Sequence, residues 1–155
     1  MALVRILVDG YSLLHSWPEL APGKARHSAV AREELIAVLT QYHDACGTPV
    51  TIVFDGAGSK RQADETPSTT AVEILYSRAG QTADQMIERA AYRLKEYGEV
   101  MVVTNDFAER DTVSSSGGLT SSCENFIRTV QGALDEMQRA VRHYNQRERE
   151  KFRTQ

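Results

Sequence analysis

Short apolar runs alternate with helix-type patterns along most of this chain. The runs are nearly continuous, which is typical of strands buried on both faces of a sheet, and they occupy residues 3–8, 50–54, 72–76 and 100–103. Apolar residues at helical spacing predict helices over about 28–46, 82–97 and 121–144. Strands separated by helices pair in parallel through right-handed crossovers. We therefore predict an α/β fold, a three-layer α/β/α sandwich with a mainly parallel central sheet.

Polar residues and glycines mark the ends of these elements. Ser28 can cap the first helix and Gly47 can end it. The other two helices are predicted to begin with capping boxes, at Thr82–Gln85 and Ser121–Glu124. Segments without hydrophobic period are predicted to be loops, at residues 11–26, 57–68 and 114–118.

The length of 155 residues fits one domain, and we expect residues 1–138 to form it, followed by a basic helical extension at 139–155. No apolar run approaches the roughly 20 residues of a membrane helix. The first strand begins so close to Met1 that we expect no secretion signal. These features favour a cytoplasmic protein without a membrane partner. Cys46 and Cys123 lack metal-ligand spacing and are expected to be buried free thiols.

Charge is divided unequally along the chain. Residues 139–155 contain six Arg or Lys and two Glu, a net charge of +4, so the total of −3 leaves −7 for residues 1–138. An acidic body argues against a nonspecific DNA-binding protein, and we expect no DNA partner. The basic extension can hold a polyanion, or it can be simply a solvated helix end.

Four aspartates occupy similar places relative to the predicted strands. Asp9, Asp55 and Asp106 each follow an apolar strand, and Asp84 lies in the first turn of a helix. The carboxyl ends of parallel strands meet at one edge of a sheet, so these side chains can converge. Two unit charges about 4 Å apart repel by roughly 4 kcal/mol at an effective dielectric near 20. A hard divalent cation offsets that repulsion, and oxygen ligands without a His or Cys set favour Mg²⁺ or Mn²⁺.

A metal bound by carboxylates suits phosphodiester hydrolysis, because it lowers the pKa of a bound water and stabilises the leaving oxygen. The chain has no phosphate-binding loop ending in Gly-Lys-Ser/Thr. Each aspartate also has a structural alternative. Asp9-Gly10 is a common turn, Asp84 can interact with the helix dipole, and Asp106 can cap a short helix from Phe107. Asp111 is expected to be a solvated loop residue.

Four stretches together resemble a known family, the YacP-like group of NYN-domain endoribonucleases, which have a PIN-like fold. They are ILVDGYSLLHSWPEL, TIVFDG, EILYSRAGQTADQMIER and VMVVTNDFAERD, in family order. The resemblance implies an NYN/PIN-like domain with a metal-dependent RNase activity. It implies Asp9, Asp84 and Asp106 as catalytic metal ligands, with Asp55 as a supporting carboxylate.

The chain departs from the family pattern in the same motifs. Ser12 stands where the family usually has Asn, a side chain expected to orient the metal site or the scissile phosphate, so Ser12 can retune activity. His15 stands where the family tends to have Gly, and is a candidate phosphate contact or a plain loop residue. Ser114 and Ser115 lie in a loop that differs from the usual one, where substrate selection can change.

Basic and aromatic residues near the predicted edge are candidate contacts for RNA. Phosphate contacts are expected from basic loop residues: Lys24, Arg26, Lys60, Arg61 and Arg110. Base stacking is expected from Tyr11, Trp17 or Phe107, although Trp17 can instead pack beneath its own loop and Tyr11 can be half-buried. A cleft edged by loops favours single-stranded RNA over a duplex, so the expected partner is a single strand, with mRNA and ribosome-bound RNA as candidates.

Three functions compete. The first is a Mg²⁺- or Mn²⁺-dependent endoribonuclease acting on single-stranded RNA. The second is an RNA-binding module with weak or no catalysis, which the serine at position 12 motivates. The third is a phosphohydrolase for small phosphate esters, which is disfavoured because the chain lacks the DxD doublet of the haloacid dehalogenase type.

Overall fold

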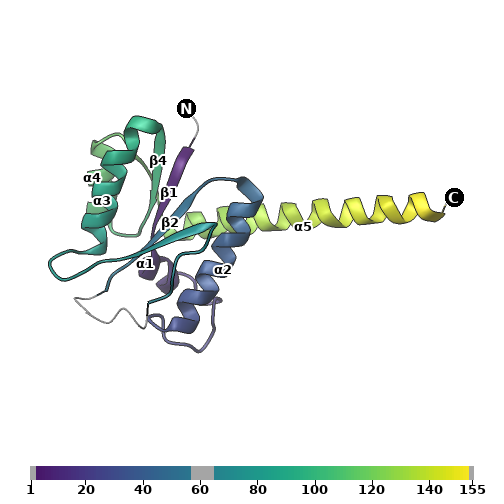
Figure 1. The fold of residues 1–155 in the computed structure, drawn as a ribbon, viewed down its shortest axis with the longest axis horizontal. Coiled ribbons are helices and arrows are strands. Elements are labelled where there is room, and N and C mark those ends of the chain that lie inside the picture. Colours follow the sequence, from purple (N-terminus) through teal and green to yellow (C-terminus); the bar gives the residue numbers. More distant parts are fainter. Residues whose placement is uncertain (1–2, 57–64, 154–155) are drawn as a thin grey trace.

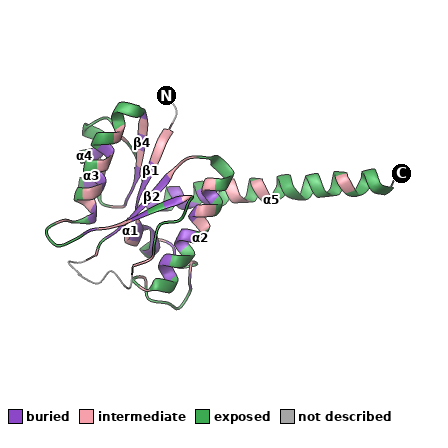
Figure 2. Ribbon diagram, in the orientation of Figure 1, coloured by how far each residue is buried: buried purple, intermediate pink, exposed green. Residues whose placement is uncertain are grey.

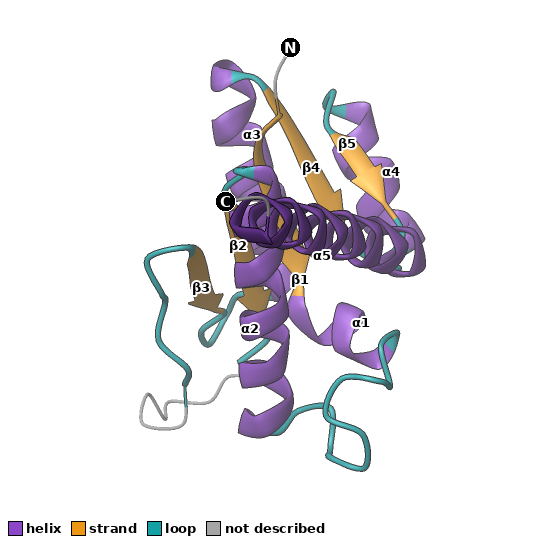
Figure 3. Ribbon diagram, turned by 90° about the vertical axis from the view of Figure 1, so that its right-hand side faces the viewer, coloured by secondary structure: helices purple, strands orange, loops and turns teal. Residues whose placement is uncertain are grey.

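A five-stranded parallel sheet forms the centre of the molecule, in the order β3-β2-β1-β4-β5 (Figures 1 and 3). This computed structural model describes residues 3–56 and 65–153. The strands are β1 (Leu3–Asp9), β2 (Val50–Phe54), β3 (Val72–Tyr76), β4 (Glu99–Val103) and β5 (Leu119–Ser121). The helices are α1 (Gly10–His15), α2 (Ala29–Cys46), α3 (Ala83–Leu94), a 3-10 turn η1 (Lys95–Tyr97), α4 (Phe107–Ser115) and α5 (Cys123–Arg153).

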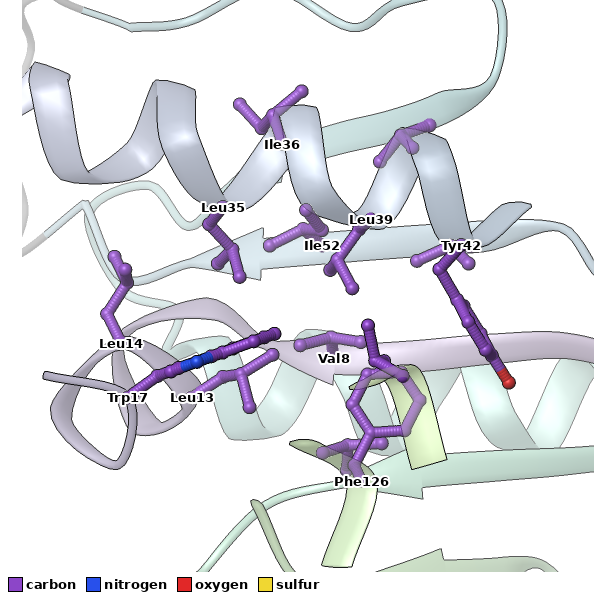
Figure 4. Close-up of a cluster of buried hydrophobic side chains, with 14 of the residues drawn as sticks. Val8, Leu13, Leu14, Trp17, Leu35, Ile36, Leu39, Tyr42, Ile52 and Phe126 are labelled. Carbon is purple, nitrogen blue, oxygen red and sulfur yellow. The ribbon is translucent and has the colours of Figure 1, made fainter. Parts of the chain in front are cut away.

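Successive residues of the central strand β1 pack into two separate cores. Ile6 and Val8 lie in the larger core, beneath α1, α2 and the first part of α5 (Figure 4). Leu7 points to the opposite face and packs beneath α3 and α4. Side chains alternate between the two faces of a strand, so a strand with apolar residues at every position must be covered on both sides. The fold is therefore the predicted α/β/α sandwich.

The predicted starts of α2 and α3 and the predicted end of α2 hold, whereas α3 ends at Leu94 and residues 95–97 form the 3-10 turn η1. The Ser28 hydroxyl accepts a hydrogen bond from the Ala31 amide (3.2 Å), and Gly47 ends α2 in the left-handed conformation (φ 76°). Thr82 and Gln85 form the predicted capping box at the start of α3. These local signals were sufficient because each involves residues within one helical turn.

Two predicted loops and one predicted helix cap are partly wrong, and residues 57–64 of the third predicted loop lie outside the described residues. The segment 11–26 begins within a short helix, α1, which Asp9 caps. The segment 114–118 instead contains the end of α4 and leads into β5, a strand too short and too polar to show an apolar run. The predicted cap at Ser121 is displaced by one residue, because Ser122 accepts the Asn125 amide (3.2 Å) and Ser121 belongs to β5.

Both cysteines are free, but only one is buried. Cys123 has no exposed surface and lies in the larger core, as predicted. Cys46 is exposed at the last position of α2, so its predicted burial is wrong. Within residues 3–56 and 65–153, no helix combines the length and apolarity that crossing a membrane requires.

The last helix, α5, is much longer than the body that it packs against. Its buried residues are all in the first eight positions: Cys123, Phe126, Ile127 and Val130. The helix then continues without a break to Arg153 and projects from the sandwich (Figures 1 and 2). Nearly all residues after Met137 are exposed, so tertiary packing holds only the beginning of this helix.

Candidate active site

Two of the predicted aspartates lie where central strands give way to helices. Asp9 ends β1 and caps α1, accepting the Ser12 amide at Oδ1 (3.4 Å). Asp106 follows β4 and caps α4, accepting the amides of Ala108 (2.9 Å) and Glu109 (3.3 Å). The proposed capping alternative for Asp106 is therefore correct. A cap uses only part of a carboxylate's acceptor capacity, so it leaves lone pairs for a ligand.

The other two aspartates lie at the same edge, one after β2 and one at the start of α3. Asp55 follows β2 and accepts the Ser77 hydroxyl (3.0 Å), while the same hydroxyl oxygen accepts the Gly56 amide (2.9 Å). Asp84 lies in the first turn of α3, between Thr82 and Gln85 of the capping box. Four separate chain segments thus bring an aspartate to the carboxyl edge of the sheet.

An open cleft of about 500 Å³ lies at this edge. Its walls include Asp9, Asp55 and Asp84, together with Ser12 and Asn105. Burial raises the pKa of Asp9 and outweighs its hydrogen bonds with Ser12, and the charges of Asp55 and Asp106 raise it further. The four carboxylates are therefore close enough to sense one another.

Asp84 has the most perturbed pKa among these aspartates. Burial is the largest cause, the charges of Asp9 and Asp106 add to it, and together they raise the pKa of Asp84 to about 6. A cation between the Asp84 and Asp106 carboxylates would relieve this repulsion and favour the ionised form of Asp84.

The side chains fit a hard cation by their chemistry. The four aspartates offer carboxylate oxygens, which Mg²⁺ and Mn²⁺ prefer, and the cleft also contains the imidazoles of His15 and His27. In the part of the chain that the structure describes, no three His, Cys, Asp or Glu side chains form a ready-made cation site. Asp9, Asp84 and Asp106 would therefore need to move together to share one ion.

Sequence reasoning missed two glutamates behind the aspartates. Glu109 is only 3% exposed, and its Oε1 has no hydrogen-bond partner among the described residues. Burial and a hydrogen bond with Glu88 raise the pKa of Glu109 to about 9, and the nearby Asp84 charge adds to the shift. Spacing could have indicated both residues, because Glu88 is four positions after Asp84 and Glu109 is three after Asp106 on their helices.

Asn105 was also missed, and it joins three segments at the cleft. Its Nδ2 donates to Ser16 Oγ (2.9 Å) and to Glu124 Oε1 (3.0 Å), and its Oδ1 accepts the Cys123 amide (2.8 Å). The end of β4 is thereby tied to the segment after α1 and to the start of α5. Glu124 serves here as an acceptor for Asn105.

One wall of the cleft is built from rings and a hydroxyl. Tyr11 packs against His27 (centroids 4.2 Å apart) and Phe54 (4.9 Å), and His15 meets His27 at 5.4 Å. Tyr11 and His15 were predicted contacts, whereas His27 was missed because it lies in an aperiodic segment distant from them in sequence. Ser12 lines the same cleft, and its side-chain hydrogen bond lowers the pKa of Asp9 against the larger effect of burial.

Several other predicted contacts lie elsewhere. The Arg26 guanidinium donates to four backbone carbonyls, those of Leu14, Trp17, Ala21 and Lys24, so it holds its own loop together. Trp17 is 4% exposed and packs in the larger core (Figure 4). Neither is free to contact RNA. The backbone carbonyl of Lys24 takes part in the same loop, and its side chain is not among those that line the cleft.

Most of the remaining predicted contacts lie on helix α4, some near its start and others at its end. Phe107, at its first position, is 75% exposed, and the Arg110 guanidinium lies over its ring at 4.5 Å. Ser114 and Ser115 are at the opposite end of this helix, about 12 Å along its axis from Phe107. Asp111 is exposed on α4 rather than in a loop. Lys60 and Arg61 lie outside the described residues.

Comparison with known proteins bears on the same stretches. A family model described as YacP-like NYN domain matches residues 6–155. This chain belongs to the YacP-like NYN family. It is 30% identical over 138 residues to the protein named Uncharacterized protein YacP from Bacillus subtilis (strain 168), which covers 88% of this chain and 81% of that protein.

Solved structures agree with the YacP-like assignment. Two crystal structures of Rae1 (YacP) from Bacillus subtilis, one of them a mutant, each match with a TM-score of 0.77. The mutant is 29% identical over 93% of this chain and 85% of that chain. The other is 27% identical over 96% and 84%. The YacP-like NYN fold is nuclease-like and associated with nucleic-acid binding, which agrees with an acidic cleft at the sheet edge.

Proposed function

We propose that this protein is a metal-dependent endoribonuclease that hydrolyses phosphodiester bonds of single-stranded RNA in the acidic cleft. The observation that carries the proposal is the arrival of Asp9, Asp55, Asp84 and Asp106 at one edge from four separate chain segments. Holding like charges together is unfavourable unless a ligand uses them. Membership of a nuclease-like family supports the same activity.

Asp9, Asp84 and Asp106 would hold the ion, Mg²⁺ or Mn²⁺. A divalent ion in such a site makes bound water more acidic and stabilises negative charge on phosphate oxygens. Asp55, fixed by Ser77, supports the set from the β2 side. Asp9 and Asp106 are held at the sheet edge by the helices that they cap, and from there their carboxylates would converge with Asp84 when an ion binds.

The wall of the cleft that Tyr11, His15 and His27 form would position the RNA strand. Tyr11 and His27 present rings beside the carboxylates, where a base can stack, and His15 can donate to a phosphate. Ser12 lines the same cleft with a hydroxyl that can hydrogen-bond to RNA. An open cleft with one stacking wall suits a single strand, whose bases are free to stack on side chains. A cytoplasmic location and an mRNA or ribosome-bound substrate belong to the same proposal.

The test is cleavage of a labelled single-stranded RNA by the purified protein with Mg²⁺ or Mn²⁺. Asp9→Asn should abolish cleavage without unfolding the protein, because asparagine caps α1 about as well as aspartate. Asp111→Asn is the matched control, since it removes an equal charge from an exposed position on α4. Undiminished cleavage in excess chelator, or by Asp9→Asn, would contradict the proposal.

A second candidate is an RNA-binding module without turnover. Serine at position 12, where the family usually has asparagine, favours it, together with carboxylates not yet arranged as a cation site. This candidate predicts RNA binding without cleavage in Mn²⁺, even after Ser12→Asn. Cleavage of RNA by the natural chain in Mn²⁺ would exclude it.

A further inference from the structure

The projecting part of α5, residues 139–153, has a continuous basic face. We call these residues the basic arm. Positions 139, 142, 146, 149 and 153 follow one another at helical spacing and share one side of the helix, with Arg at all but 146. The stripe is about 21 Å long at 1.5 Å per residue. Arg142, Arg149 and Arg153 line one shallow groove of about 400 Å³ together with Asn145, Gln146 and one acidic residue, Glu150.

The arginines of this stripe are available to a ligand. They are exposed on a helix that leaves the body (Figure 2). Among the residues that the structure describes, the ion pair of this segment joins Lys151 to Glu148 (3.4 Å), so Arg142, Arg149 and Arg153 form none with another described residue. Arginine is suited to phosphate because its planar guanidinium can donate two parallel hydrogen bonds to one group.

The charge of the basic arm favours RNA over two other possible ligands, a second copy of the chain and an anionic membrane. Residues 139–155 have a net charge of +4, so two copies of the arm repel each other. An anionic membrane would favour a broad apolar face opposite the arginines, but the apolar side here holds only Val141, Tyr144 and Phe152, with Glu148 between them. Amide side chains between the arginines add hydrogen-bond donors for phosphate or sugar oxygens.

We propose that the basic arm binds the phosphate backbone of RNA outside the cleft, so that one RNA molecule contacts both surfaces. The inference rests on the proposed function, because it takes RNA as the ligand. Cys123, the first residue of α5, is bonded to Asn105 at the cleft. Arg142 and Arg153 are about 28 and 45 Å farther along the axis. Only RNA long enough to span that distance gains the second contact.

The experiment compares two triple variants, each made in an Asp9→Asn background so that the RNA is not cleaved. The arm variant is Arg142→Gln, Arg149→Gln and Arg153→Gln. The control variant is Arg89→Gln, Arg93→Gln and Lys95→Gln, which removes the same charge from exposed positions on α3 and η1. The probes are a single-stranded RNA of about 60 nucleotides and one of about 10, titrated at several salt concentrations.

The arm variant should bind the long RNA about tenfold more weakly, and the slope of log affinity against log salt should become shallower by about 2, since each lost phosphate contact on a single strand contributes about 0.7. Binding of the short RNA should not change, and the control variant should bind both as the parent does. Replacing the three arginines by lysine should keep the salt slope, which excludes a folding defect as the cause.

An unchanged slope in the arm variant, or an equal change in the control variant, would overturn the proposal. Two other results would also overturn it. One is a dimer of the parent chain that the arm variant does not form. The other is sedimentation of the protein with anionic lipid vesicles without binding to RNA. These measurements need no turnover. Cleavage of the short RNA by the chain with Asp9 restored tests the proposed function separately.

Discussion

The acidic cleft and the basic arm concentrate opposite charges in opposite ways. In the cleft, carboxylates come from four distant segments, two of them half-buried (Asp9 and Asp84) and two exposed (Asp55 and Asp106). Burial, together with the charges of Asp9 and Asp106, raises the pKa of Asp84 to about 6. On the arm, the charges lie along one exposed helix and neighbour one another in sequence. Charges gathered by tertiary structure are desolvated and fixed, which suits chemistry. Charges spaced along a solvated helix suit attraction of a polyanion over a long surface.

The largest expected effect comes from disabling the cleft while the basic arm stays intact. Asp84→Asn should lower cleavage of a short single-stranded RNA at least about 100-fold, because it removes a proposed metal ligand. The salt slope for long RNA should stay as in the parent, since the arm is intact. The measurement is initial rates with the short RNA alongside binding of the long one. A changed slope with unchanged rate would reverse the roles assigned to the two surfaces.

A second prediction concerns the stability cost of the cleft. The pKa of Glu109 in the folded protein, about 9, is above its ordinary value of 4.5, so between these values the folded chain binds a proton that the unfolded chain has released. Stability should therefore fall as pH rises through this window. Glu109→Gln cannot titrate and should be more stable than the parent near pH 8, by about 1–3 kcal/mol.

Urea unfolding near pH 4 and pH 8 measures this difference, which should vanish at the lower pH. Glu136→Gln is the matched control, because Glu136 is exposed on α5 and belongs to neither surface. A Glu109→Gln variant less stable than the parent near pH 8 would show that the buried carboxyl stabilises the fold.

A third prediction links metal binding to pH. With the pKa of Asp84 raised to about 6, a cation must displace a proton at lower pH. Affinity for Mn²⁺ should thus fall about tenfold for each pH unit below 6 and level off above it. Titration calorimetry between about pH 5 and 8 measures this. The dependence should be absent from Asp84→Asn, and an equal dependence in that variant would assign the proton to another group.

The smallest expected effect is at Ser12. Its side-chain hydrogen bond with Asp9 favours the ionised carboxylate, so Ser12→Ala should weaken Mn²⁺ binding by about 3–10-fold. Ser12→Asn, which restores the usual family residue, should change affinity less because an amide can also donate to Asp9. If both variants bind Mn²⁺ as the parent does, the Ser12 side chain has no part in the metal site.

Prediction from sequence succeeded where the determining interactions are local. The apolar runs at β1 and β2, the caps at Ser28 and Thr82 and the resemblance in the strand-end motifs all depend on residues close together in the chain. It failed at β5 and α1, which are too short for a hydrophobic period to be visible. The serine cap of α5 was misplaced by one residue for the same reason, since two adjacent serines offer similar local signals.

The sequence alone was enough to predict the order of the four longer strands and of α2, α3 and α5, and the placement of an aspartate after each of three apolar runs, because these are properties of neighbouring residues. Only the tertiary structure decided which side chains share the cleft. It brought His27 beside Tyr11 and placed Glu109 and Glu88 behind the aspartates, and it diverted Arg26 to backbone carbonyls. These outcomes depend on burial and on contacts between segments distant in sequence, which a pattern of single residues does not encode.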